Sequence, residues 1–179
     1  MRNSFIFVVT IFLLQSCFTG DEKQLITVGG MYSLSIPAFL SEGNNLNDDA
    51  TLQYQHIWKE FYVIAIEESK DEMHKALVDN RLTDMYAANI DGYSKLILDD
   101  FKESLSDPYQ TALIDATVNG MPARITTLEG RVDGIDAFYS LGLYEGEDRY
   151  FQVLAWTLSG KKYSYQPLMD EILYSLKEL

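Results

Sequence analysis

The chain has 179 residues and carries 27 acidic side chains against 14 Lys and Arg, which gives a formal net charge of −13 at pH 7. This balance argues against nucleic acid as a partner, because basic side chains provide the affinity for phosphates, and against broad docking on anionic lipid headgroups. With 47% hydrophobic residues and four prolines, the chain can bury a core and its length fits a single domain.

The N-terminus has the three parts of a secretory signal. Arg2 supplies a positive charge, residues 5–14 form an apolar run interrupted by Thr10, and Ser16 is a small residue before the expected cut. The run is too short to span a bilayer as a helix, which needs about 20 apolar residues. We therefore expect residues 1–16 to be a signal peptide.

Cys17 directly follows Leu14-Gln15-Ser16, a sequence typical of the lipobox at which bacterial lipoproteins are acylated. It is the only cysteine, so it has no disulfide partner in the chain. We interpret Cys17 as the lipidation site, residues 17–24 as a tether and residues 25–179 as the working domain. A plain signal peptide with an incidental cysteine is the alternative.

A lipidated Cys17 places the protein in the cell envelope. Stable anchoring needs two or more hydrophobic signals, and lipoproteins of this class carry a diacylglyceryl group and usually a third acyl chain. Asp21 and Glu22 follow the cysteine closely, as in surface-export signals of some lipoproteins. The expected location is the periplasmic face of the outer membrane or the cell surface.

Alternation and turn residues predict strands in the first part of the domain, and a helical period begins at Ser69. The continuous apolar run at residues 61–66 is typical of a strand covered on both faces. Asp107-Pro108 ends the longest helix. We expect strands at residues 25–28, 31–36, 52–57 and 61–66, and helices at residues 69–80, 82–89 and 92–105.

The last third predicts an antiparallel meander. Asn119-Gly120, Asp133-Gly134 and residues 146–148 are turn signals between alternating segments. A final helical stripe at residues 165–176 should lie across one sheet face. The expected fold class is α+β, a sheet flanked by helices. The four strands are expected at residues 111–118, 123–132, 137–144 and 150–158.

Two segments of this layout resemble those of the PsbP-like fold, which includes DcrB-type bacterial lipoproteins. They are Tyr32-Ser33-Leu34-Ser35-Ile36-Pro37 and Asn119-Gly120-Met121-Pro122-Ala123. The resemblance covers residues 25–179 in the order of elements. It implies an α/β/α sandwich and a non-enzymatic role in binding partner proteins or stabilising assemblies. No functional residue can be carried over, because the matching positions are turns and core.

The two histidines are the only candidates for acid–base or metal chemistry beyond the acids and serines. His56 lies in an alternating strand, where a hydrogen-bonded structural histidine is expected. His74 follows Asp71 at helical spacing, but one histidine and one carboxylate are too few for a closed zinc site. A solvated helix face is the preferred interpretation of His74.

No catalytic motif, metal site or cofactor site is predicted. Glu67-Glu68 and Asp99-Asp100 are adjacent in sequence, so their side chains should diverge, and Ser140 and Ser159 have no histidine that the sequence can place beside them. An alternation like half an EF-hand, formed by Asn45, Asn47 and Asp49, lacks the required glycine and glutamate, because Ala50 and His56 stand there.

The chain has 12 tyrosines and two tryptophans. We expect most to pack in the core or across strands, including Trp58 and the aromatics of the meander, whereas Tyr163 and Tyr165 should be partly exposed. Together these features predict a lipid-tethered binding or assembly module whose partner is an envelope protein. The alternatives are a small-ligand binder with a pocket between sheet and helix, and a hydrolase that would need His56 or His74 in a cleft beside an acid or serine.

Overall fold

The computed structural model describes residues 22–179. The predictions for the signal peptide, for Cys17 and for most of the tether lie outside these residues. Among the helices that the structure describes, none is long and apolar enough to cross a membrane.

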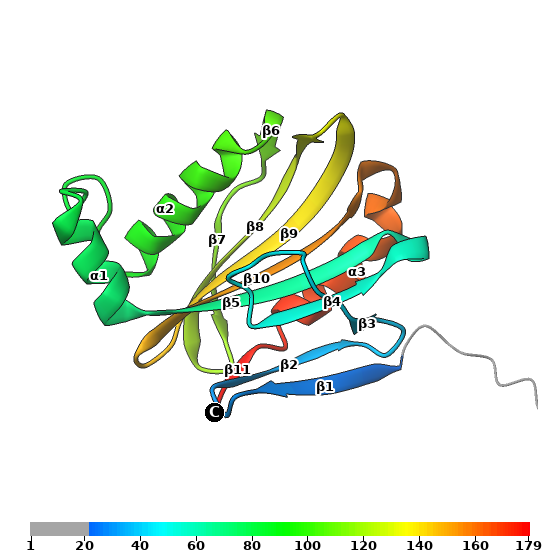
Figure 1. Cartoon of the computed structure of the whole chain (residues 1–179), viewed down its shortest axis with the longest axis horizontal. Helices are drawn as coiled ribbons and strands as arrows, with labels where there is room; N and C mark the ends of the chain where they lie inside the picture. The colour runs from blue at the N-terminus through cyan, green and yellow to red at the C-terminus, as the bar shows by residue number, and fades with distance from the viewer. Residues whose placement is uncertain (1–21) are drawn as a thin grey trace, which may run out of the picture.

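A large antiparallel sheet forms the middle of the described chain (Figure 1). Its strand order is β3-β4-β5-β10-β9-β8-β6, and β7 pairs with β8 beside β6. A smaller sheet has the order β1-β2-β11. The strands are β1 (Lys23–Val28), β2 (Tyr32–Pro37), β3 (Ser41–Glu42), β4 (Leu52–His56), β5 (Phe61–Ser69), β6 (Ser106–Gln110), β7 (Ile114–Val118), β8 (Met121–Val132), β9 (Ile135–Glu145), β10 (Arg149–Leu158) and β11 (Lys177–Glu178).

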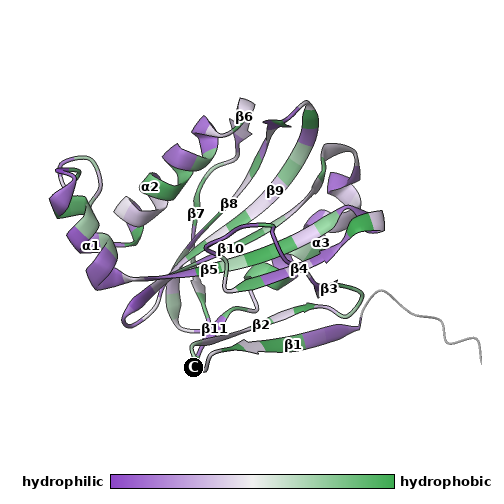
Figure 2. Cartoon of the chain, viewed as in Figure 1, coloured by the Kyte–Doolittle hydropathy of each residue, from purple (hydrophilic) through white to green (hydrophobic). Residues whose placement is uncertain are grey.

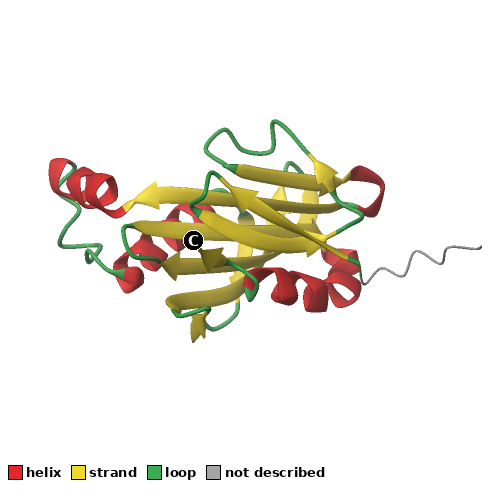
Figure 3. Ribbon diagram, turned by 90° about the horizontal axis from the view of Figure 1, so that it is seen from below, coloured by secondary structure: helices red, strands yellow, loops and turns green. Residues whose placement is uncertain are grey.

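Helices cover both faces of the large sheet. Helices α1 (Lys70–Asp79) and α2 (Ile90–Glu103) belong to one face, and α3 (Lys162–Leu173) packs on the other together with the small sheet (Figures 1 and 3). Each face has its own hydrophobic cluster. Short 3-10 turns, η1 (Ile57–Lys59) and η2 (Ser159–Lys161), lead into β5 and α3. The expected fold class, α+β with helices flanking an antiparallel sheet, is confirmed.

The predicted meander is confirmed as β7 to β10, each strand pairing with the next. Two of its turns have the backbone that their sequences predict. Asn119 and Gly120 have φ values of 49° and 92°, and Asp133 and Gly134 have 50° and 82°. Two successive positive φ values are what a two-residue hairpin turn requires, and Asn-Gly and Asp-Gly adopt them readily.

The apolar run of β5 is covered on both faces in its middle, as predicted. Val63 packs in the cluster under α3, while Ile64, 5% exposed, points to the α2 face. The end of β5 nearer to α1 is hydrophilic (Figure 2). This change along one strand creates the site described below.

The structure differs from the predicted elements in three places. Residues 82–89 form turns and bends rather than a helix, and Asn89 caps α2 by accepting a hydrogen bond from the Gly92 amide, 3.0 Å. Helix α2 ends at Glu103, before Asp107-Pro108 as predicted, but residues 106–110 then pair with β8 as β6, a strand that was not predicted. Helix α3 stops at Leu173, so Leu176 lies beyond the helix although it is buried in the same cluster.

Candidate functional site: a groove beside helix α2

A groove of about 500 Å³ lies between the large sheet and helix α2. Its floor consists of Ile64, Leu154 and Leu141, which are cross-strand neighbours on β5, β10 and β9. Because alternate residues of a strand share a face, Ile66 continues this floor along β5. We call this site the α2 groove. Its volume lies within the range typical of ligand pockets.

Helix α2 and the loop between β3 and β4 form the two walls of the α2 groove. Ile97 and Phe101 face the floor from α2, and the Phe101 ring meets the Tyr139 ring edge-on, with centroids 4.9 Å apart. Asn47 and Asp49 of the loop stand opposite. The loop wall is therefore polar, and the helix wall is apolar apart from Asp100.

Gln53 of β4 holds that loop in place. Its side-chain oxygen accepts hydrogen bonds from the backbone amides of Leu46 and Asn47, at 2.8 and 3.3 Å, and its amide group donates to the Asn47 carbonyl at 3.0 Å. The loop is thereby fixed to the sheet. The polar side of the groove therefore has a fixed position relative to the sheet.

Polar groups converge at one end of the α2 groove. The Glu68 carboxylate accepts a hydrogen bond from the Tyr93 hydroxyl, 2.5 Å, and a weaker one from the Gln152 amide, 3.4 Å. Glu67 also lines the groove, but its carboxylate pairs with Arg149, which is not among the groove's lining residues. The adjacent acids thus point to different partners, as predicted. Both contribute to the site, which was not predicted.

Behind Glu68 lies a buried aromatic stack. The Tyr93 and Tyr150 rings are 4.3 Å apart at 12°, and His74 Nε2 lies 3.3 Å from the Tyr150 hydroxyl. Burial, together with the nearby Glu68 carboxylate, raises the pKa of Tyr93 well above its usual range. Burial likewise raises the pKa of Tyr150 to about 12. Both hydroxyls therefore stay protonated at neutral pH, and Tyr93 remains a donor to Glu68.

The mouth of the α2 groove is acidic. The carboxylates of Asp49, Glu68 and Asp100 line it, whereas that of Glu67 is neutralised by Arg149 outside the groove. An apolar floor with an excess of carboxylates favours an apolar ligand that carries a positive charge.

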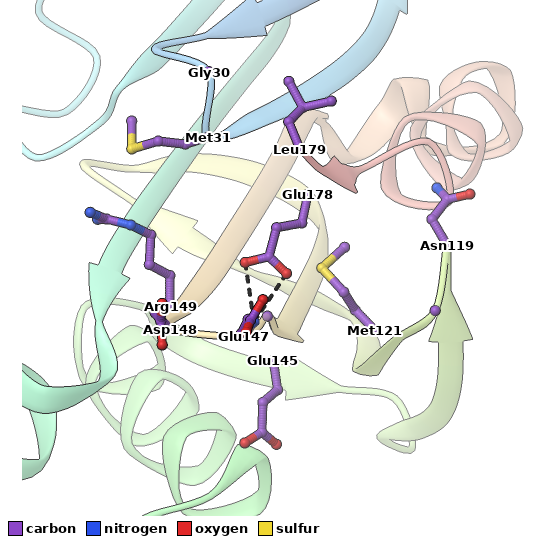
Figure 4. Close-up of a pocket in the computed structure, with 12 residues that line it drawn as sticks. Gly30, Met31, Asn119, Met121, Glu145, Glu147, Asp148, Arg149, Glu178 and Leu179 are labelled. Atoms are coloured by element: carbon purple, nitrogen blue, oxygen red, sulfur yellow. Dashed lines mark hydrogen bonds between the residues drawn. The ribbon is translucent and has the colours of Figure 1, made fainter.

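A second hollow, of about 700 Å³, lies at the end of the molecule where the C-terminus meets the β9–β10 turn (Figure 4). Its polar groups diverge: Glu178 points to the turn and accepts from the Glu147 amide, while Arg149 points away to pair with Glu67. Glu145 points away from Glu178 and pairs with Lys70 at 3.1 Å. Because Arg149 and Glu145 have partners outside this hollow and Glu178 is bound to the turn, the hollow is a weaker candidate site.

The structure gives both histidines structural partners. His56 caps η1, its Nδ1 accepting from the Lys59 amide at 3.1 Å, and its ring meets Phe39 edge-on. His74 contacts Tyr150 and is half-buried, rather than solvated as expected. Within residues 22–179, neither ring has a carboxylate or a serine as a hydrogen-bond partner.

The other polar candidates are also placed. Asn47 Oδ1 accepts from the Asp49 amide at 2.8 Å, an asparagine turn rather than half an EF-hand. Asp99 pairs with Lys95, while Asp100 reaches the α2 groove. Ser140 is fully buried. Among the described residues, no group of three or more His, Cys, Asp or Glu is arranged to hold a metal ion.

The prediction that most aromatic side chains are packed is confirmed for the meander and is wrong for one residue, Trp58. Tyr139, Tyr144 and Tyr150 are buried, but Trp58 is 91% exposed. Tyr163 is exposed as expected, and Tyr165 is half-buried against Phe61, with ring centroids 5.0 Å apart.

No family model and no curated protein match the sequence. Solved structures share the fold. Cyanobacterial PsbP (CyanoP) from Synechocystis sp. PCC 6803 aligns with a TM-score of 0.58 and 11% identity, covering 93% of this chain and 99% of its own. LpqN, involved in cell envelope biogenesis of Mycobacterium tuberculosis, aligns with a TM-score of 0.54 and 9% identity, covering 88% of this chain and 90% of its own. A protein of unknown function from Pseudomonas aeruginosa, PA94, aligns with a TM-score of 0.50 and 12% identity, covering 86% of this chain and 94% of its own.

The fold is therefore PsbP-like, as the two quoted segments predicted. At these identities the likeness shows the fold alone. One of the neighbours takes part in cell-envelope biogenesis.

Proposed function

We propose that this protein is a lipid-anchored, non-enzymatic binding module of the cell envelope that holds a partner protein in the α2 groove. Lipid on Cys17 tethers the domain, on the periplasmic face of the outer membrane or at the cell surface. The observation that carries the binding role is the α2 groove itself, an apolar floor with convergent polar groups at one end.

The chemistry of the α2 groove defines the partner segment. Ile64, Leu141 and Leu154 offer an apolar floor to aliphatic or aromatic side chains. The carboxylates at the mouth favour a neighbouring Lys or Arg, which Glu68 can bind through the oxygen lone pairs that Tyr93 and Gln152 leave open. The partner is thus an apolar segment that carries a basic residue. Tethering raises its effective concentration at the membrane surface.

Mass spectrometry of the protein purified from membranes tests the anchor. We expect a chain that begins at Cys17 with the mass of two or three acyl chains and their glyceryl group. An unmodified sulfur would overturn the tether.

Site-specific photocrosslinking in intact envelopes tests the α2 groove. A photoreactive residue replaces Ile66 in the groove or, as the matched control, Val78 on the exposed side of α1. We expect a protein crosslink from position 66 that is absent from position 78, weakens with salt and is lost when Leu154→Trp fills the floor. The same crosslinks from both positions, or none from position 66, would contradict the proposal.

The second candidate function is binding of a small apolar ligand, which the volume of the α2 groove favours. It predicts a non-covalent adduct in native mass spectra of the intact protein that disappears with Leu154→Trp. A bare mass together with a protein crosslink at position 66 would exclude it.

A further inference from the structure

One end of the molecule gathers exposed apolar side chains. Trp58 is 91% exposed and Tyr163 89% exposed, the two highest values among the large hydrophobic residues that the structure describes as exposed. They come from η1 and the first turn of α3, and two more come from the β8–β9 turn. We call this group the tether-end patch: Ile57, Trp58, Val132, Ile135 and Tyr163.

The parts of the tether-end patch are neighbours in space. Lys161 Nζ donates to the Lys59 carbonyl at 3.1 Å, which joins η2 to η1. Val132 and Ile135 share a hollow of about 260 Å³ with Glu60, the residue after η1. The β4–β5 and β8–β9 connections and the start of α3 lie on one side of the molecule in Figure 1, opposite α1.

The anchored terminus enters the fold at the same end. β1 begins at Lys23, which shares a surface hollow with Lys59 and Tyr165 and pairs with Glu171 at 2.7 Å. Cys17 precedes Lys23 by six positions. Six residues span at most about 20 Å even when fully extended. A bilayer that holds lipid on Cys17 therefore lies within about 20 Å of this end.

Charge at the tether-end patch is balanced rather than acidic, unlike the chain as a whole. Glu129 pairs with Lys162 and Asp136 with Arg131, while Asp133 stands in the β8–β9 turn and Glu60 follows η1. Within residues 22–179, Lys59 and Lys161 have no ion-pair partner. Lys59 Nζ lies 5.0 Å from the centroid of the Phe39 ring, and Lys161 Nζ donates to the Lys59 carbonyl. Exposed tryptophan and tyrosine rings such as Trp58 and Tyr163 are enriched in the interfacial region of a bilayer.

We propose that the tether-end patch rests on the bilayer that holds the lipid of Cys17, with Trp58 and Tyr163 in the headgroup region. The inference rests on the proposed lipidation of Cys17. It is compatible with the expectation from net charge, because docking here depends on aromatic side chains and a tether rather than on a basic surface. The contact supplies a second membrane signal beside the acyl chains and fixes the orientation of the domain.

Tryptophan fluorescence of the mature lipidated chain tests this. Trp156→Phe leaves Trp58 as the sole tryptophan and keeps an aromatic ring over Tyr62. The protein is reconstituted in vesicles of phosphatidylethanolamine and phosphatidylglycerol, with and without acyl chains brominated near the headgroup. We expect Trp58 emission to shift to the blue and to lose most of its intensity with brominated lipid, compared with the soluble Cys17→Ser chain.

Moving the probe gives the matched control. In a chain with Trp58→Phe and Trp156→Phe, Tyr163→Trp should be quenched and Tyr174→Trp should not, because Tyr174 follows the opposite end of α3. Both positions are exposed, so neither change should alter the urea midpoint.

Each outcome of the fluorescence experiment tests either the lipid contact or the tether. A blue shift of Trp58 without quenching means that protein covers the patch, and overturns the lipid contact. An unshifted, unquenched Trp58 in a chain whose mass shows the lipid overturns this inference and leaves the tether intact. An unmodified Cys17 overturns both.

Discussion

The Tyr93 hydroxyl donates a 2.5 Å hydrogen bond to the Glu68 carboxylate and so joins helix α2 to strand β5 at the polar end of the α2 groove. Tyr93 is fully buried and Glu68 is half-buried. The bond therefore both shapes the site and stabilises the packing of α2.

Replacing Tyr93 with Phe removes this donor but keeps the ring that stacks on Tyr150. Glu68 then loses its closest partner in a half-buried position. We expect Tyr93→Phe to lower the free energy of unfolding by about 1–3 kcal/mol, measured by urea denaturation. Tyr163→Phe, at an exposed position, is the control and should change it by less than about 0.5 kcal/mol. Equal effects of the two variants would contradict the role of the bond.

Stability should fall at alkaline pH. Burial raises the pKa of Tyr150 from 10.0 to about 12 in the folded protein. Above pH 10 the unfolded chain releases this proton first, so the folded state binds more protons and the free energy of unfolding falls as pH rises. The contribution is complete below pH 10 and is lost towards pH 12, with a slope of about 1 kcal/mol per pH unit at its steepest for this residue.

Urea denaturation at pH 8, 10 and 11 measures that slope. Burial also raises the pKa of Tyr93 and Tyr144, so the wild-type slope is the sum of several groups. Tyr150→Phe should reduce it between pH 10 and 11 by about 1 kcal/mol per unit. An unchanged slope would show that Tyr150 titrates normally in the folded state.

The entry to α2 depends on a glycine. A β-carbon on Gly92 would lie 1.9 Å from the carbonyl oxygen of Ala87, a backbone atom that cannot rotate away. We expect Gly92→Ala to destabilise the fold by about 1–3 kcal/mol or more, although alanine is the better helix former. At Gly160, where nothing lies within 4 Å of the added carbon, the same substitution should be close to neutral. Thermal unfolding of the two variants compares them.

The same glycine shows why residues 82–89 were mispredicted. Their local composition is compatible with a helix, but Arg81 has a φ of 58° and the following turns fold back onto the first turn of α2. That contact joins residues five positions apart in a non-helical turn, and the helical period of apolar residues carries no information about it.

The meander and the helices α1, α2 and α3 could be predicted because their signals are local: Asn-Gly and Asp-Gly turns, alternation and helical spacing. Strand β11 could not, because two residues at the C-terminus form a strand only by pairing with β2. β6 likewise forms only by pairing with β8, because the proline at position 108 disfavours a strand in the local sequence.

The α2 groove was partly visible in the sequence. Glu68 is in phase with Ile64 and Ile66, which indicates an acid on an otherwise apolar sheet face, close to a helix. Its partner Tyr93 could be identified only as a core residue. Trp58 was expected inside and is exposed, because nothing in the described chain covers η1.

With the proposed contact between the tether-end patch and the bilayer, the length of the strands would set the distance between the membrane and the far end of the domain. β5 runs for nine residues from η1 at the tether end to the start of α1, a rise of about 30 Å at 3.3 Å per residue. A domain standing on Trp58 and Tyr163 would hold α1 at roughly that height above the headgroups. Partners that extend from the bilayer by less than this height would contact only the strand ends near the tether-end patch. Helix α1 would be accessible to proteins that cross the periplasm or project from the opposite surface.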